Sequence, residues 1–195
     1  TGTILVLRPH AGADLSALPK ERVRIVQGFR PDYDAFVAAG YAVTPEAEGQ
    51  HGAAVVVLPR SRVEGRALIA AAVVSLPAGA PVIIDGARTD GVEGILREVR
   101  TRVTVGEVIS KAHGKIFAFA APEASVFADW EARTTVLEDG SVTLPGIFSA
   151  DGPDPGSALL AASLPEKLVG VGADLGAGWG YLAKAVLTRP GVSQL

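Results

Sequence analysis

Short apolar runs rich in β-branched residues alternate with helix-like stretches along the first half of the chain. The runs cover residues 3–7, 22–27, 53–58 and 81–85, and the helix-like stretches cover residues 32–39, 62–75 and 91–100. Strands that are apolar on both faces are typical of parallel sheets covered by helices. The alternation therefore predicts a parallel α/β sheet for this part of the chain.

Two further strands are expected at residues 106–110 and 115–120, because the residues between them leave room only for a turn. A parallel sheet that ends in such an antiparallel hairpin resembles the Rossmann-type layout of class I methyltransferases. The loop after the first strand, residues 8–12, has no G-x-G, so we expect this methyltransferase-like domain to hold no cofactor. A different α/β fold with similar connectivity is the alternative.

Residues 123–145 are predicted to join two domains. They are bounded by Pro122 and Pro145, and they contain a small expected hairpin, 134–137 with 141–144, around Asp139-Gly140. We therefore expect a first domain of residues 1–122, a linker over 123–145 and the beginning of a second domain over 146–195. Within that second part, helices are expected at 157–164 and 181–187, and strands at 168–174 and from 192 onward.

Composition excludes several classes of function. The chain has no cysteine and its three histidines lie far apart in sequence, so no metal site is expected. The longest apolar stretch, residues 67–84, is broken by Pro77, Gly79 and Pro81, which argues against a membrane span. Lys111, His113 and Lys115 are interpreted as a solvated polar turn, and no dense basic patch indicates an autonomous nucleic-acid binder. We expect a cytoplasmic protein whose first residues have been trimmed.

A glycine turn between an expected strand and an expected helix carries the strongest chemical signal. Asp174 ends the strand, and glycines follow at 176, 178 and 180. Glycine permits positive φ and lets a ligand lie against the backbone. A dinucleotide site would need a small residue at position 181, where this chain has Tyr181.

The D-x-G-x-G-x-G pattern resembles motif I of S-adenosylmethionine-dependent methyltransferases. Upstream, residues 145–149 read P-G-I-F-S and are followed by Asp151, Asp154, Gly156-Ser157 and Leu159-Leu160. This order is similar to the stretch that precedes motif I in the small-subunit ribosomal RNA guanine-N2 methyltransferase family. That family also begins with a cofactor-free, methyltransferase-like domain.

The resemblance implies S-adenosyl-L-methionine as cofactor and small-subunit ribosomal RNA as partner. It assigns cofactor binding to Asp174, Gly176, Ala177, Gly178, Gly180, Phe148, Asp154 and Ser157. The glycine turn would lie against the methionine part, and Asp174 would accept hydrogen bonds from its amino group or through water. Structural alternatives stay open: a turn cap for Asp174, plain core for Phe148, a helix N-cap for Ser157, and packing on the next helix for Trp179.

Two features of the resembling family are absent from these residues: the acidic residue that would end the strand starting at 192 and hold the cofactor ribose, and a later motif. The N-P-P-[FY] motif that holds the target guanine is missing, and asparagine does not occur at all. We therefore assign no catalytic residue, and we expect the chain as given to be inactive and the complete protein to transfer methyl groups. The alternatives are an RNA-binding or folding-assistance module, and a methyltransferase of the same fold acting on protein or a small molecule. An incomplete sheet would also leave an edge for self-association.

Overall fold

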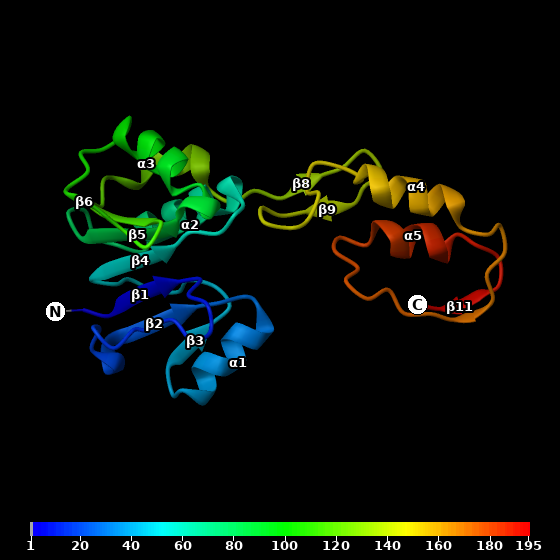
Figure 1. The fold of residues 1–195 in the computed structure, drawn as a ribbon, viewed down its shortest axis with the longest axis horizontal. Coiled ribbons are helices and arrows are strands. Elements are labelled where there is room, and N and C mark those ends of the chain that lie inside the picture. The colour runs from blue at the N-terminus through cyan, green and yellow to red at the C-terminus, as the bar shows by residue number, and fades with distance from the viewer. Residues whose placement is uncertain (1) are drawn as a thin grey trace. The chain divides into compact units, whose positions relative to one another are not determined.

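The structure is a computed structural model that describes residues 2–195. The chain divides into two compact units, Thr1–Ala132 and Arg133–Leu195. Each unit is described by itself (Figure 1).

The first unit is built on one seven-stranded sheet. In chain order the strands are β1 (Ile4–Leu7), β2 (Val23–Val26), β3 (Ala42–Thr44), β4 (Ala53–Val57), β5 (Pro81–Ala87), β6 (Val108–Lys111) and β7 (Gly114–Ala120). Their order across the sheet is β3-β2-β1-β4-β5-β7-β6. Strands β1 to β5 are parallel, whereas β7 is antiparallel to both β5 and β6. The predicted parallel α/β sheet with a terminal antiparallel hairpin is confirmed.

Helices cover both faces of this sheet. They are α1 (Arg30–Ala38), α2 (Arg62–Val74) and α3 (Val92–Arg100), with short 3-10 turns η1 (Lys20–Arg22) and η2 (Arg88–Asp90). Side chains of β1 alternate between the two faces, as a strand requires. Ile4 and Val6 pack with Phe36 of α1, whereas Leu5 and Leu7 join the larger cluster that includes α2 and α3. The apolar runs thus form strands that are buried on both sides.

A 3-10 segment, η3 (Ala124–Trp130), packs on this unit although the sequence places it in the linker. Phe127 and Trp130 are buried in the larger core cluster. The Arg102 guanidinium lies 4.6 Å from the Trp130 ring centroid and donates to both carboxylate oxygens of Asp129. Aromatic burial and cation–π contacts therefore attach residues 124–130 to the first unit.

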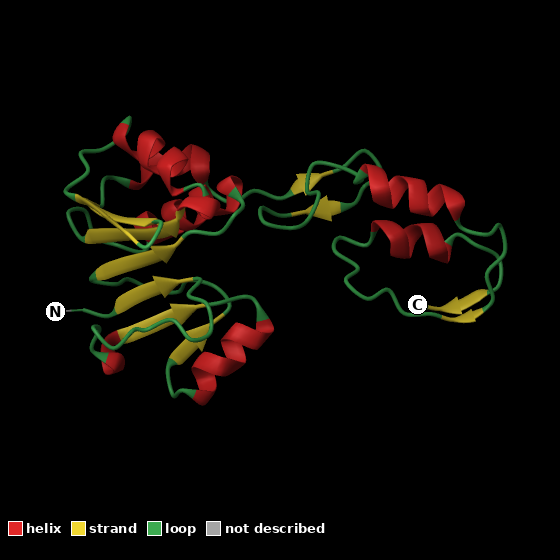
Figure 2. Cartoon of the chain, in the orientation of Figure 1, coloured by secondary structure: helices red, strands yellow, loops and turns green. Residues whose placement is uncertain are grey.

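The second unit is small and contains long loops (Figure 2). Its elements are β8 (Thr135–Val136), β9 (Val142–Thr143), α4 (Pro155–Ser163), β10 (Gly170–Val171), α5 (Tyr181–Leu187) and β11 (Val192–Gln194). Strands β8 and β9 form the expected hairpin, β10 and β11 pair in parallel, and α4 lies beside α5. Within residues 133–195 only Thr143 and Ala161 are classed as buried, and apolar side chains such as Val169, Val171 and Leu175 are exposed.

No helix within residues 2–195 is both long and apolar enough to cross a membrane. No group of three or more His, Asp or Glu side chains in the same range is placed to hold a metal ion.

Candidate functional site

A pocket of about 160 Å³ in the second unit is lined by three segments that are separate in sequence. The first is the loop before α4, the second is the start of α4, and the third is the glycine turn between β10 and α5. The lining residues are Phe148, Ser149, Asp154, Ser157, Asp174, Gly176, Ala177, Gly178, Trp179, Tyr181 and Leu182. Segments up to 34 positions apart in sequence, from Phe148 to Leu182, therefore meet at one site.

The glycine turn presents bare backbone to this pocket. Gly176 and Gly178 have φ of 82° and 60°, in the left-handed region that favours glycine. A Cβ placed on either residue would find no heavy atom within 4 Å. Open space therefore lies beside the backbone on the side that a side chain would occupy.

Asp174 contributes to this pocket a carboxylate oxygen that has no hydrogen-bond partner. Its Oδ2 is buried and accepts no hydrogen bond from the described residues. A buried acceptor without a donor costs about 1–3 kcal/mol, and more when it is charged. The turn-cap role left open for Asp174 has no hydrogen bond to support it, so this oxygen is free to accept a donor from a ligand.

Asp154 has a structural role within the same pocket. It is the N-cap of α4, and its Oδ2 accepts from the Ser157 backbone N–H at 3.0 Å and from the Ser157 hydroxyl at 3.4 Å. The expected helix start at Ser157 is therefore wrong by two residues, because Asp154 caps the helix and Pro155 opens it. Ser157 lies in the first turn and its hydroxyl faces the cap.

Trp179 links the glycine turn to the loop before α4. Its indole N–H donates to the Ser149 carbonyl at 3.1 Å, and its ring lies 5.5 Å from the Tyr181 ring at the start of α5. The expected packing of Trp179 on the following helix is found, together with a hydrogen bond that the sequence did not indicate. Phe148 lines the pocket with 69% of its surface exposed, so it is not part of a core here.

Seven of the eight residues assigned from sequence line this one pocket: Phe148, Asp154, Ser157, Asp174, Gly176, Ala177 and Gly178. Gly180 does not line it, and instead caps α5 with φ of 92°. Sequence reasoning gave no role in the site to Ser149, Tyr181 and Leu182, which also line the pocket. Tyr181 and Leu182 could have been included because they directly follow the glycine turn, whereas Ser149 carries no such signal.

The lining residues suit binding better than proton transfer. Their only carboxylates are Asp154, which caps a helix, and Asp174, and they include no His or Lys. The pocket is also smaller than the roughly 300–1,000 Å³ of typical small-molecule sites. It can therefore enclose part of a nucleotide-sized ligand.

Comparison with known proteins gives this region a family. The model of the methyltransferase small domain matches residues 140–194, which include every residue that lines the pocket. This segment belongs to the methyltransferase small domain family. The predicted resemblance to methyltransferases is thereby confirmed for this segment.

Curated relatives of the chain extend beyond the methyltransferase small domain segment. A ribosomal RNA small subunit methyltransferase C from Idiomarina loihiensis is 27% identical over 195 residues, covering 94% of this chain and 58% of the relative. A protein of the same name from Pseudomonas putida is 33% identical over 144 residues, covering 70% of this chain and 43% of the relative. The chain therefore spans about half the length of these relatives.

A solved structure shares the fold over the whole chain. It is a 16S rRNA N2 methyltransferase from T. thermophilus, in complex with AdoMet and guanosine, with a TM-score of 0.71 and 21% identity. The match covers 100% of this chain and 58% of that one. At this identity the comparison establishes the α/β fold predicted from the sequence, a Rossmann-like methyltransferase fold.

Proposed function

We propose that this chain is part of an S-adenosylmethionine-dependent methyltransferase that methylates guanine N2 in small-subunit ribosomal RNA. In this proposal the second unit holds the cofactor with the seven assigned residues that line the pocket, and the first unit holds none. The names of the curated relatives, and the AdoMet and guanosine bound to the T. thermophilus enzyme, support the same activity for the complete protein.

The unpartnered Asp174 oxygen beside an open glycine turn carries the proposal. The methionine part of the cofactor has an ammonium group, which is a charged donor of the kind that Asp174 Oδ2 lacks. The empty space beside Gly176 and Gly178 would admit a ligand against the backbone. A cavity of about 160 Å³ is suited to this methionine part and leaves the nucleoside part outside it.

The cofactor, once bound, supplies a methyl group on a positively charged sulfur. The residues of this chain would bind the methionine part of the cofactor and so orient the methyl group. Asp174 would accept a hydrogen bond from the amino group, and Gly176 to Gly178 would give backbone contact. Phe148 and the Asp154–Ser157 turn cover the opposite side of the pocket. Catalysis of a direct displacement is chiefly alignment, so these contacts would set where the methyl group lies.

At the corresponding edge of the first unit, polar side chains are paired with the protein's own groups. The Gln27 side-chain amide is buried and donates to the Pro9 carbonyl at 2.8 Å, directly after β1. Arg8, at the end of the same strand, forms an ion pair with Glu64 of α2 at 2.6 Å. These paired groups occupy the carboxyl ends of the strands, which is where ligands bind in α/β sheets. They support a cofactor-free role for this unit.

Calorimetry on the 195-residue chain tests cofactor binding. We expect one AdoMet per chain and no heat from NAD, because Tyr181 stands where a dinucleotide turn needs a small residue. The activity itself is tested with a protein of the relatives' full length, small-subunit RNA and tritiated AdoMet, followed by nucleoside mass spectrometry. Formation of N2-methylguanosine supports the proposal, and methylation of protein or of small molecules alone contradicts it.

Two further parts of the proposal concern the protein's surroundings. We place it in the cytoplasm, where ribosomal RNA of the small subunit is its substrate. We also propose that chains associate through the short parallel pair β10–β11, whose Val171 side chain is exposed. Sedimentation velocity tests this: a concentration-dependent dimer is expected, and a monomer at all concentrations contradicts it.

A further inference from the structure

The turn between β6 and β7 carries a cluster of basic side chains that the proposed cofactor site does not use. Arg88 follows β5, and Lys111, His113 and Lys115 belong to the hairpin; we call these four residues the basic tip. They line a shallow pocket of about 300 Å³ in the first unit. Arg88, Lys111 and His113 are exposed to solvent and Lys115 is half-buried.

The basic tip lies at the edge of the sheet where α/β proteins bind ligands. Gly114 of β7 pairs with Ala87 at the carboxyl end of β5, and the Arg88 backbone N–H donates to the His113 carbonyl at 2.8 Å. The hairpin therefore places its cations beside the carboxyl ends of the parallel strands.

Only one of the cations is neutralised locally. Lys115 lies 3.9 Å from a Glu93 carboxylate oxygen and donates to the Ser110 hydroxyl at 3.1 Å. Within residues 2–195, Arg88 and Lys111 have no ion-pair partner. The region around the turn is therefore locally positive at neutral pH.

The turn keeps an unfavourable backbone conformation. Ala112 and His113 have φ of 49° and 60°, and neither is the Asn or Gly that such two-residue turns favour. A left-handed conformation costs a residue with a Cβ roughly 1–2 kcal/mol. Strain of this kind is concentrated at functional positions.

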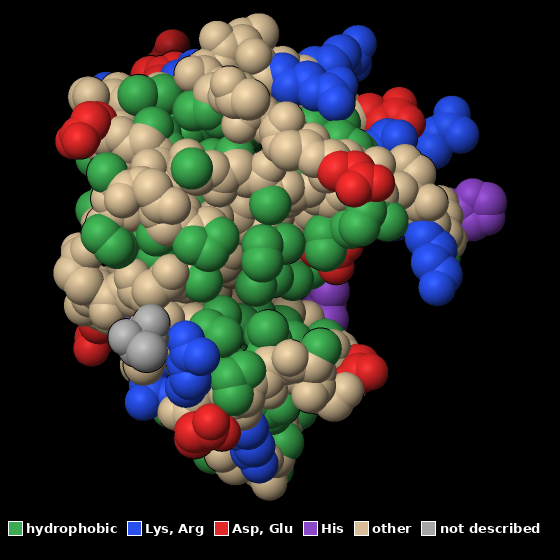
Figure 3. Space-filling view, turned by 90° about the vertical axis from the view of Figure 1, so that its left-hand side faces the viewer, with side chains coloured by type: hydrophobic (Ala, Val, Ile, Leu, Met, Phe, Trp, Pro, Cys, Tyr) green, Lys and Arg blue, Asp and Glu red, His purple; other side chains and the backbone are tan. Residues whose placement is uncertain are grey.

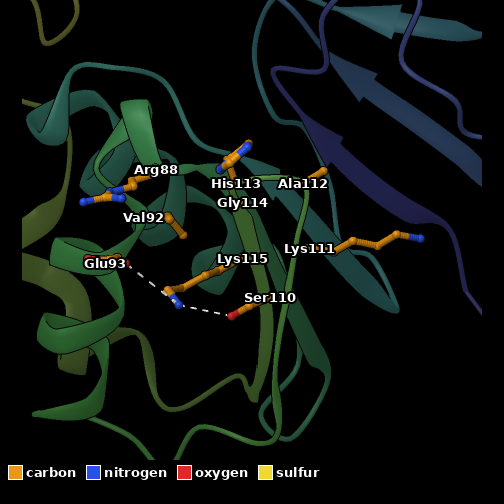
Figure 4. Close-up of a pocket in the computed structure, with 9 residues that line it drawn as sticks. All are labelled: Arg88, Val92, Glu93, Ser110, Lys111, Ala112, His113, Gly114 and Lys115. Atoms are coloured by element: carbon orange, nitrogen blue, oxygen red, sulfur yellow. Dashed lines mark hydrogen bonds and ion pairs between the residues drawn. The ribbon is translucent and has the colours of Figure 1, made fainter.

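The directions of the side chains indicate what the basic tip can bind. In Figure 4 Lys111 points away from Glu93 and Lys115, while Arg88 and His113 point in other directions. Cations that diverge cannot surround one compact anion, but they can contact successive phosphates of a chain. No Phe, Tyr or Trp lines the pocket, so the stacking platform typical of proteins that bind single strands is not provided. Figure 3 shows Lys and Arg side chains and a His standing out on the right-hand side of one face, interspersed with acidic groups.

We propose that the basic tip binds the sugar-phosphate backbone of RNA without sequence preference. This inference rests on the proposed function only in its choice of RNA as the polyanion. The first unit would thereby contribute substrate affinity, while the second unit binds the cofactor.

Fluorescence anisotropy of the 195-residue chain with a labelled single-stranded RNA of about 16 nucleotides tests this proposal. The double variant R88A/K111A removes two cations, so affinity should fall several-fold. The slope of log affinity against log salt should become shallower by about 1.4, since each phosphate contact on a single strand contributes about 0.7. Arg100→Ala, which removes an exposed arginine at the end of α3, is the matched control and should change neither quantity.

Other outcomes are equally informative. The charge-conserving variant R88K/K111R should retain the salt slope of the parent chain. A loss of that slope in R88K/K111R would show that RNA binding depends on conformation and not on charge, and would overturn the proposal. An unchanged salt slope in R88A/K111A also overturns the proposal. Binding of the parent chain and of R88A/K111A to phosphatidylserine vesicles is measured alongside. If the variant loses vesicle binding while its RNA binding stays intact, the proposal is likewise overturned. The AdoMet affinity of the same variants, measured by calorimetry, should equal that of the parent chain. Failure of the parent to bind AdoMet would refute the cofactor proposal and leave the RNA result standing.

Discussion

The indole N–H of Trp179 donates to the Ser149 carbonyl at 3.1 Å, across 30 positions of sequence. This bond joins the glycine turn to the loop that carries Phe148. Ser149 has φ of 53°, so the loop is held in a conformation that a serine disfavours. The contact therefore fixes the distance between the two walls of the candidate cofactor pocket.

The Trp179→Phe variant tests this link. It keeps an aromatic ring beside Tyr181 but removes the donor, and we expect a loss of about 1 kcal/mol of stability. AdoMet affinity should fall several-fold in calorimetry, because the Phe148 loop is no longer held in place. Tyr33→Phe in the first unit is the control, since the described residues give its hydroxyl no hydrogen bond and it lies outside the pocket. Equal AdoMet affinity in the Trp179→Phe variant and the parent would contradict this role.

The two carboxylates of the pocket should respond in opposite ways to removal. Asp154→Ala removes the N-cap of α4 and should destabilise the chain by about 1 kcal/mol. Asp174→Ala removes a buried oxygen that has no partner, so the melting temperature should stay the same or rise. AdoMet affinity should nevertheless fall at least tenfold in Asp174→Ala. A lower melting temperature in Asp174→Ala would show that Asp174 has a structural role that this account does not give it.

Attachment of η3 to the first unit should depend on the shape of Arg102, not only on its charge. Its guanidinium donates to both oxygens of Asp129 and to the Val126 carbonyl, and it lies over the Trp130 ring. A lysine cannot reproduce this geometry. Arg102→Lys should lower the unfolding free energy by about 1–2 kcal/mol in urea titration. Arg100→Lys is the matched control, and an equal effect of both variants contradicts the assignment.

The link between the β8–β9 turn and α5 should weaken in acid. Lys184, 2.8 Å from Asp139 Oδ2, and hydrogen bonds from Ser141 lower the pKa of Asp139 to about 2. A lowered carboxyl pKa stabilises the fold above the ordinary value of about 3.9, and this contribution is lost as pH falls from there to about 2. NMR titration of the Asp139 carboxyl carbon measures it.

Lys184→Gln should move the Asp139 midpoint upward, whereas Lys167→Gln, which replaces an exposed lysine of the same unit, should leave it in place. An unchanged midpoint in Lys184→Gln would show that the ion pair does not form in solution.

The sheet of the first unit was predictable because its strands are nearly all apolar. Strand β3 was not predicted, because Ala42–Thr44 is three residues long and no member of it is buried. The segment η3 was assigned to the linker because it follows Pro122 and is too short to show a periodic pattern, although it carries two buried aromatic side chains, Phe127 and Trp130. Sequence patterns reveal burial only where buried residues recur at regular spacing along a helix or strand. Two buried aromatic residues in a short segment give no such recurrence.

The glycine turn was predictable as a site because positive φ, and a ligand lying against bare backbone, both favour glycine at those positions. The Trp179–Ser149 bond was not, since it depends on a tertiary contact between loops that have no periodic pattern. The first turn of α4 lay between these cases: Asp154 and Ser157 can both cap a helix, and only the backbone geometry decides for Asp154.

Two glycines of the second unit provide the most direct test of the central claim. Gly176 and Gly140 have φ of 82° and 79°, and a Cβ on either would meet no heavy atom within 4 Å. Alanine at either position should therefore cost the same stability, roughly 1–2 kcal/mol. Gly176 lines the pocket, whereas Gly140 lies in the β8–β9 turn.

AdoMet calorimetry on Gly176→Ala and Gly140→Ala separates strain from ligand contact. The account predicts that Gly176→Ala lowers AdoMet affinity at least tenfold, while Gly140→Ala binds like the parent chain. Equal affinities in the two variants, or no binding of AdoMet by the parent chain, would contradict the assignment of this turn to the cofactor.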